Sequence, residues 1–291
     1  MKRLVPIIVI AVIVAGAAYF AYVRTHSERG IEGPVLSARF LDAEFGNAVI
    51  LRTPEGKTVV IDPASGRGGK ALADLLDGER TRAVTVIFTN PTPDRAAALA
   101  ALRKTVRVSK VIRPELGAAT QAWKRAIVRA KCGPVAEVAL AGGDKLRLSP
   151  KVVIEALGPV RPSTSSGCSA RGGYDGSLVF RVRFGAKTIF FPSEIRAAGE
   201  SDLIASGRDL TGSVLVVGPR AQYRGVSLEL LSMVRPEVIV VSSSTRPSSS
   251  VIGRLSERNT GAALYQTYKD GIIEIDTNGR SIQVATGGGE P

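Results

Sequence analysis

Histidine is nearly missing from this chain, which has 291 residues and a single histidine, His26. A catalytic zinc ion usually needs about three nitrogen, sulfur or carboxylate ligands and one open position, and imidazole is a frequent choice. A Ser-His-Asp triad also needs an imidazole base. Because His26 lies in a polar stretch near the N-terminus, the sequence argues against both kinds of histidine-dependent hydrolase. A Ser-Lys arrangement stays open, although neither G-x-S-x-G nor S-x-x-K occurs.

Cysteine and aromatic residues are also scarce. The two cysteines, Cys132 and Cys168, are too few to form a metal cluster by themselves and do not form a C-x-x-C pair. In an exported domain they either form a disulfide or remain two buried thiols, and the sequence leaves both possibilities open. Aromatic residues make up only 5% of the chain, which weakens any function based on stacking nucleic-acid bases against rings.

Acidic residues are outnumbered, with 26 Asp and Glu against 39 Lys and Arg, for a formal net charge of +13. Such an excess favours polyanionic neighbours. The basic side chains concentrate in residues 103–113 and 124–131, for which a solvated helix face is the default interpretation. The alternative is binding of phosphate-rich polymer, either DNA or anionic wall polymer. The candidate contacts are Arg103, Lys104, Arg107, Lys124, Arg125 and Arg129.

The one long hydrophobic run is at the N-terminus. Lys2 and Arg3 precede an uncharged stretch from Leu4 to Val23, and twenty helical residues span about 30 Å, the thickness of a bilayer core. We therefore expect residues 1–23 to be an uncleaved signal anchor, giving a single-pass cell-membrane protein with its domain outside the cytoplasm. The alternative is a signal peptide cleaved after the small residues 15–17.

Beyond a linker at residues 24–34, strand-like and helix-like patterns are mixed. The runs AVILRT, KTVVIDP and AVTVIFT predict strands, and residues 68–78 and 119–131 show helical spacing. Residues 161–176 form a Ser/Gly-rich loop. This pattern predicts one α/β domain over residues 35–285 with sheets inside and helices outside, followed by a disordered tail at residues 286–291.

Five segments resemble, in order, the soluble metallo-β-lactamase-fold domain of the competence protein ComEC. FLDAEFGNAVILRTPEGKTVVID is similar to its opening, where FLDVGQGDA precedes a hairpin and an aspartate. The other four segments are TNPTPDRAAAL, DGSLVFRVRFGAKTIFFPSEI, VLVVGPRAQ and MVRPEVIVVSSS. The resemblance covers nearly all of residues 35–285. It implies a four-layer αββα sandwich, metallohydrolase ancestry and a link to DNA uptake.

The resemblance also implies a degenerate metal site. Where the family has T-H-x-x-x-D-H, this chain has Asn90, Thr92, Asp94 and Arg95, so only the aspartate is kept. The histidine of the HHGS segment falls at Pro219 or Arg220, the last family histidine falls within residues 244–247, and Glu194 replaces a bridging aspartate. Arg95 would place a fixed positive charge where a cation should bind, and Coulomb repulsion opposes such binding.

Asp94 has an ordinary structural explanation as well. Thr92 can act as an N-cap, Pro93 suits the first helical position, and Asp94 in the first turn complements the helix dipole. A weaker alternative groups Asp62, Asp94 and Glu194 around a hard cation such as magnesium or calcium. Asp62 precedes Pro63, however, and such a residue more often ends a strand and begins a turn.

Three functions remain. The favoured one is a membrane-anchored, catalytically inactive ComEC-like protein without a cofactor, which acts as an envelope binding or scaffold module for DNA, another anionic polymer, or competence and envelope proteins. The second is a divergent metal-dependent phosphodiester hydrolase. The third is a structural envelope protein without a ligand.

Overall fold

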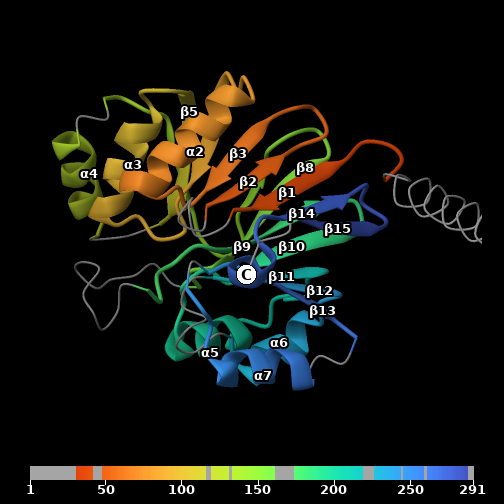
Figure 1. Cartoon of the computed structure of the whole chain (residues 1–291). Coiled ribbons are helices and arrows are strands. Elements are labelled where there is room, and N and C mark those ends of the chain that lie inside the picture. Colours follow the sequence, from red (N-terminus) through yellow and green to blue (C-terminus); the bar gives the residue numbers. More distant parts are fainter. Residues whose placement is uncertain are drawn as a thin grey trace, which may run out of the picture.

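Two β-sheets pack face to face, and helices cover the outer face of each (Figure 1). This computed structural model describes residues 31–41, 48–115, 119–130, 133–160, 174–218, 226–243, 245–258 and 261–287. The expected four-layer αββα sandwich is confirmed. The anchor predicted at residues 1–23 lies outside the described residues. Within the described ranges, the structure has no helix with the length and apolar character needed to cross a membrane.

Sheet A has eight strands in the order β15-β14-β1-β2-β3-β4-β5-β6. Neighbouring strands are antiparallel from β15 to β3 and parallel from β3 to β6. The strand bounds are β1 Leu36–Phe40, β2 Val49–Arg52, β3 Thr58–Ile61, β4 Ala83–Ile87, β5 Arg107–Pro114, β6 Glu137–Leu140, β14 Ile273–Thr277 and β15 Ile282–Thr286.

Sheet B repeats this plan with seven strands in the order β13-β12-β11-β10-β9-β8-β7. The strands β7 to β10 are antiparallel, and β10 to β13 are parallel. Their bounds are β7 Lys145–Arg147, β8 Val152–Gly158, β9 Val179–Phe184, β10 Lys187–Phe191, β11 Val214–Val217, β12 Val238–Val241 and β13 Ala263–Gln266.

Helices cover the parallel half of each sheet (Figure 1). On sheet A these are α2 Gly66–Gly78, α3 Pro93–Leu102 and α4 Ala119–Arg129; on sheet B they are α5 Ala197–Ala205, α6 Leu228–Val234 and α7 Ser249–Arg258. The short helix α8 Thr267–Asp270 follows β13. Since the parallel strands are buried on both faces, β4, β11 and β12 read as nearly continuous apolar runs.

Three apolar layers hold the sandwich together. Between the sheets, the rings of Phe180 and Phe191 stack with centroids 4.7 Å apart. Under the helices of sheet A, Trp123 of α4 meets Phe88 edge to face at 5.4 Å, and a third layer lies under α5, α6 and α7. Each fully buried large apolar side chain contributes about 1.5–3 kcal/mol through removal from water.

One sequence expectation is wrong at residues 103–113. The basic spacing there predicts a solvated helix face, but residues 107–114 form strand β5 in the parallel half of sheet A. Arg113 is buried, and its Nε donates to Glu137 Oε2 at 2.8 Å. The charge of Arg113 is therefore paired with the carboxylate of Glu137, so Arg113 is not part of a basic surface.

Candidate functional site

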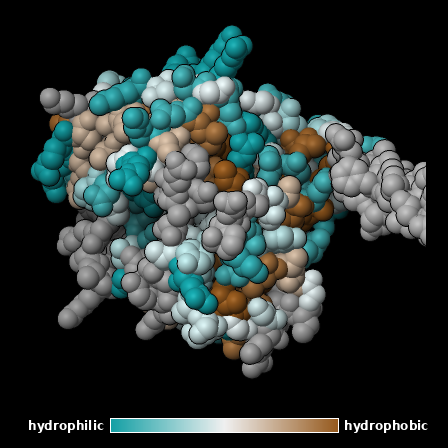
Figure 2. Space-filling model, in the orientation of Figure 1, coloured by the Kyte–Doolittle hydropathy of each residue, from teal (hydrophilic) through white to brown (hydrophobic). Residues whose placement is uncertain are grey.

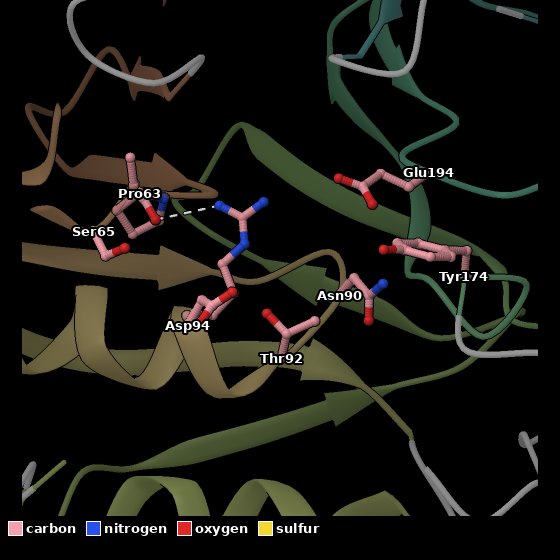
Figure 3. Close-up of a pocket in the computed structure, with 9 residues that line it drawn as sticks. Pro63, Ser65, Asn90, Thr92, Asp94, Tyr174 and Glu194 are labelled. Atoms are coloured by element: carbon pink, nitrogen blue, oxygen red, sulfur yellow. Dashed lines mark hydrogen bonds between the residues drawn. The ribbon is translucent and has the colours of Figure 1, made fainter. Parts of the chain in front are cut away.

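A pocket of about 360 Å³ opens at the edge where the parallel strands of both sheets end. Ligands of open α/β sheets bind at this kind of edge, beyond the carboxyl ends of the strands. Residues following β3, β4 and β10 contribute to the pocket, together with a residue before β9. The lining residues are Pro63, Ala64, Ser65, Asn90, Thr92, Asp94, Arg95, Tyr174 and Glu194 (Figure 3).

The structure brings together most of the residues predicted for the degenerate site. Asn90, Thr92, Asp94, Arg95 and Glu194 line this one pocket. Pro219 and Arg220 lie outside the described residues, as does Ser244. Residues 245–247 do not belong to the pocket lining. Of the aligned positions, the turn at residues 90–95 and Glu194 are therefore neighbours in space, although they come from opposite halves of the chain.

Arg95 is fixed at one wall of the pocket. Its Nη1 donates to the backbone carbonyl of Asp62 at 2.8 Å and to that of Pro63 at 3.2 Å, the second bond being drawn in Figure 3. Its Nη2 lies 3.8 Å from Asp62 Oδ1. The positive guanidinium of Arg95 therefore lies against the turn after β3, at the pocket wall where the resemblance places metal ligands.

Asp62 has both carboxylate oxygens engaged by Thr89. Oδ1 accepts from the Thr89 amide at 2.9 Å, and Oδ2 accepts from the Thr89 hydroxyl at 2.6 Å. The backbone of Asp62 has a φ of 49°, a left-handed conformation that aspartate tolerates better than most residues. This confirms the turn predicted at the end of the strand and connects the ends of β3 and β4.

The hard-cation alternative built on Asp62, Asp94 and Glu194 stays a prediction. Across the described ranges, the structure contains no group of three His, Cys, Asp or Glu side chains placed to hold a metal ion. Asp62 faces Thr89 and does not line the main pocket. Among the described residues, this pocket offers the carboxylates of Asp94 and Glu194 and no imidazole to a metal ion.

Helix α3 begins as predicted. Thr92 is the N-cap residue, Pro93 occupies the first helical position, and Asp94 lies in the first turn. The Thr92 side chain makes no capping hydrogen bond, but its carbonyl accepts from the Arg95 amide at 3.0 Å. Asp94 is exposed at the pocket mouth, where its charge complements the helix dipole without any metal.

The opposite wall comes from the second half of the chain. Ser193 has a φ of 61°, and its Oγ donates to the Leu178 carbonyl at 2.5 Å, which fixes the turn that carries Glu194. The guanidinium carbon of Arg196 lies 4.6 Å from the centre of the Tyr174 ring. Tyr174 is a site residue that sequence reasoning missed, because it lies in a Ser/Gly-rich loop with no periodic signal.

The predicted polyanion contacts lie elsewhere, on α4, in the connection after α3 and at the start of β5. Lys104, Arg107, Lys124, Arg125 and Arg129 are exposed. The half-buried Arg103 donates from Nη1 to the Gly133 carbonyl at 3.3 Å, which joins the end of α3 to the segment after α4. Hydrophilic residues occupy the left edge of Figure 2, where Figure 1 places α4. Cys132 and Cys168 lie outside the described residues.

Two solved structures place this fold among known proteins. CmlA, a diiron beta-hydroxylase from Streptomyces venezuelae, matches with a TM-score of 0.52 and 15% identity, over 89% of this chain and 55% of CmlA. The chain therefore spans about half the length of CmlA. A protein from Parabacteroides distasonis described as a metal-dependent hydrolase matches with a TM-score of 0.50 and 10% identity, over 80% of this chain and 93% of that protein.

These likenesses show a metallo-β-lactamase-like fold and, at such low identity, nothing further. No protein-family model matches the sequence. No curated protein matches it either.

Proposed function

We propose that this protein is a non-hydrolytic, ComEC-like member of the metallo-β-lactamase fold that acts as a binding or scaffold module at the cell envelope. The observation that carries the proposal is the position of Arg95, whose guanidinium is held by the carbonyls of Asp62 and Pro63. A fixed cation at this wall opposes a metal ion through Coulomb repulsion. The chain also lacks the imidazoles that would compensate, since His26 is its only histidine.

Metal analysis tests this proposal directly. Untagged full-length protein, purified in detergent and incubated with zinc, should retain no stoichiometric zinc and should not hydrolyse bis(4-nitrophenyl) phosphate. A variant that restores imidazoles, Asn90→His/Thr92→His/Arg95→His, should gain zinc, because it supplies three nitrogen ligands beside Asp94. One or more zinc ions per wild-type chain, or chelator-sensitive turnover that Asp94→Ala abolishes, would overturn the proposal in favour of a divergent phosphodiester hydrolase.

The envelope location rests on the N-terminal sequence. Lys2 and Arg3 precede the apolar span from Leu4 to Val23, which is long enough to cross a bilayer as a helix. Protease added to intact spheroplasts should digest the domain and leave cytoplasmic marker proteins untouched. Protection of the domain until the membrane is lysed would contradict this topology.

Anionic polymer is the ligand that the surface charge favours. The exposed cations lie on α4, in the α3–β5 connection and at the start of β5, and we propose that together they make one basic face. The Arg103 bond to Gly133 joins the end of α3 to the segment after α4. DNA and phosphate-rich wall polymers present the complementary charge. If neither binds, the third function, a structural envelope protein without a ligand, takes the place of this part of the proposal.

A further inference from the structure

The chain enters the domain at one end of the sandwich, the end opposite the main pocket. Strand β1 begins there at Leu36, which pairs with Thr277 at the end of β14. Asn278, in the β14–β15 hairpin, donates from Nδ2 to the Glu32 carbonyl at 3.1 Å. The parallel strands β3, β4, β11 and β12 also begin at this end. We call this end of the domain the entry face.

Hairpins from both sheets meet at the entry face. The amide of Ala186, in the β9–β10 hairpin, donates to the Gly279 carbonyl of the β14–β15 hairpin at 2.8 Å. Lys57 Nζ, in the β2–β3 hairpin, donates to the Leu148 carbonyl between β7 and β8 at 2.9 Å. These bonds join hairpins of sheet A to hairpins of sheet B, so the entry face is one surface.

Exposed basic side chains are concentrated on the entry face. They belong to the hairpins, to the end of β7 and to the connections that lead into β4 and β12. They are Lys57, Arg80, Arg147, Lys151, Arg235 and Arg280.

The carboxylates of the same segments are fewer, and most have a basic partner. Glu79 is paired with Arg39 and Arg52. Glu237 is paired with Lys187. Glu55 is exposed, and so is Asp77 in the last turn of α2. Positive charge is therefore in excess on the entry face.

Two of these arginines occupy an unusual backbone conformation. Arg80 follows helix α2 with a φ of 54°, and Arg235 follows helix α6 with a φ of 50°. This left-handed region favours glycine or asparagine, so an arginine there costs conformational energy. Residues held in such conformations cluster at functional sites. Because both side chains are exposed, their conformation points to a use of the two guanidinium groups outside the domain.

The N-terminal segment limits how far the entry face can lie from a bilayer. Eight residues, 24–31, separate the apolar stretch that ends at Val23 from Glu32. Even a fully extended connection of this length spans only about 30 Å. Attraction between basic residues and anionic lipid acts within about 10 Å, the Debye length. The connection therefore brings the entry face near the bilayer, and the charge of the face decides whether it makes contact.

We infer that the entry face lies against the surface of an anionic phospholipid bilayer and contacts lipid phosphates through its exposed lysines and arginines. The inference rests on the proposed function, because the anchor proposed for residues 1–23 is what brings this face to a bilayer. The main pocket, at the other end of the domain, then opens away from the membrane. Helix α4 stays free to bind anionic polymer.

The test measures the reactivity of individual lysines in the full-length protein, inserted in lipid nanodiscs. One set of discs contains phosphatidylcholine alone, and the other contains phosphatidylcholine mixed with anionic phosphatidylglycerol. Acetylation with a water-soluble N-hydroxysuccinimide ester, followed by mass spectrometry, gives a rate for each lysine. Lys57 and Lys151 should react about fivefold more slowly or less in the anionic discs, since each basic residue near an anionic surface favours contact by about that factor. Lys70 on α2 and Lys124 on α4, both exposed, should react equally in both sets.

Two matched variants locate the contact. Arg147→Glu/Arg235→Glu/Arg280→Glu reverses three charges of the entry face and keeps both reporter lysines, so it should abolish the lipid-dependent slowing. Lys124→Glu/Arg125→Glu/Arg129→Glu makes the same change of net charge on α4 and should leave the slowing intact. A normal circular dichroism spectrum and melting temperature establish that each variant is folded.

High salt tests the inference on the unaltered protein. In about 1 M sodium chloride the Debye length falls to about 3 Å, so Lys57 and Lys151 should react at the same rate in both kinds of disc.

Several results would overturn the inference: equal rates of Lys57 and Lys151 in the two kinds of disc, equal slowing of Lys70 and Lys124, slowing that persists in the entry-face variant or in high salt, or slowing that is lost in the α4 variant. If the protein does not insert into nanodiscs, the anchor in the proposed function fails and the inference fails with it. If it inserts and Lys57 and Lys151 react equally in both sets, only the inference about the entry face fails.

Discussion

Arg95 and Asp62 join the two turns that follow β3 and β4: the guanidinium of Arg95 donates to the Asp62 carbonyl at 2.8 Å, while the Asp62 carboxylate accepts two hydrogen bonds from Thr89. Backbone, carboxylate and guanidinium thus form one connected network. The Arg95 side chain therefore connects the two turns directly.

Arg95→Ala should therefore lower the free energy of unfolding. The substitution removes the hydrogen bonds from a charged donor to the carbonyls of Asp62 and Pro63, and such bonds are worth about 1.5–3 kcal/mol. Urea denaturation measures the change. Arg67→Ala, which removes an exposed arginine from the neighbouring helix α2, should change stability much less. Equal effects of the two substitutions on the free energy of unfolding would show that the hydrogen bonds of Arg95 add little to stability.

Asp94→Ala should have only a small effect on stability. Asp94 is exposed in the first turn of α3, where a negative charge interacts with the helix dipole. The expected loss is about 0.3–1 kcal/mol, and it should shrink in high salt. A loss of several kcal/mol in urea denaturation would indicate a structural role that these contacts do not explain.

Glu155→Gln should destabilise the protein and remove part of its acid sensitivity. Burial alone would raise the pKa of Glu155, but hydrogen bonds and charges from Arg183 and Arg181 outweigh it and lower the pKa to about 2. Arg181 Nε lies 2.6 Å from the carboxylate and is itself buried. The stabilisation is complete above the unfolded pKa of about 4.5 and is lost as the pH falls towards 2.

The measurement is the urea midpoint of the wild type and of Glu155→Gln between pH 6 and pH 3. At pH 6 the variant should be less stable, because the buried Arg181 loses a charged partner. The difference in urea midpoint between the wild type and Glu155→Gln should become smaller as the pH falls. A constant difference over this range would contradict the lowered pKa.

Glu200→Gln should have the opposite effect to Glu155→Gln: at neutral pH it should make the protein more stable. Burial raises the pKa of Glu200, and this outweighs the hydrogen bond from Ser227 and the charge of Arg254. The ionised side chain therefore costs stability, and the wild type should gain stability as the pH falls through the raised pKa. Glutamine removes the charge and keeps an oxygen to accept from the Ser227 amide, 3.0 Å from the carboxylate in the wild type.

Thermal unfolding at pH 7 is the test of this substitution. Glu200→Gln should raise the melting temperature, whereas Asp202→Asn, on the exposed side of the same helix, should leave it nearly unchanged. A lower melting temperature in Glu200→Gln would mean that the charged hydrogen bond outweighs the cost of burial.

Duplex DNA should bind the basic face with a steep salt dependence and little sequence preference. If the face makes about six phosphate contacts, the log–log slope of affinity against salt should be about −5. Reversing Lys124, Arg125 and Arg129 to Glu should reduce the slope and leave the fold intact, because all three side chains are exposed. Absence of binding at low salt, or unchanged binding in the reversed variant, would refute the polyanion proposal.

The fold was largely predictable because burial on both faces leaves a plain signal in strands such as β4 and β12. The start of α3 was predictable from Thr92 and Pro93, whose preferences are local. Strand β5 was not, because its charged residues Arg107, Lys110 and Arg113 recur every three residues, which is closer to helical spacing than to the alternation of a strand. The burial of Arg113 beside Glu137 has no local signal either. Nor could the sequence show that Arg95 bonds to the carbonyls of Asp62 and Pro63, since that depends on how two turns meet.

The return of β14 to sheet A has a consequence for synthesis. β1 pairs with β14 along its whole length, from Leu36 opposite Thr277 to Phe40 opposite Ile273. The first strand of the domain therefore lacks one neighbour until nearly the entire chain has left the ribosome. Pairing between such distant segments slows folding. The edge of β1 therefore stays open to other strands until the last part of the chain is made, and at that stage a chaperone would protect it from aggregation.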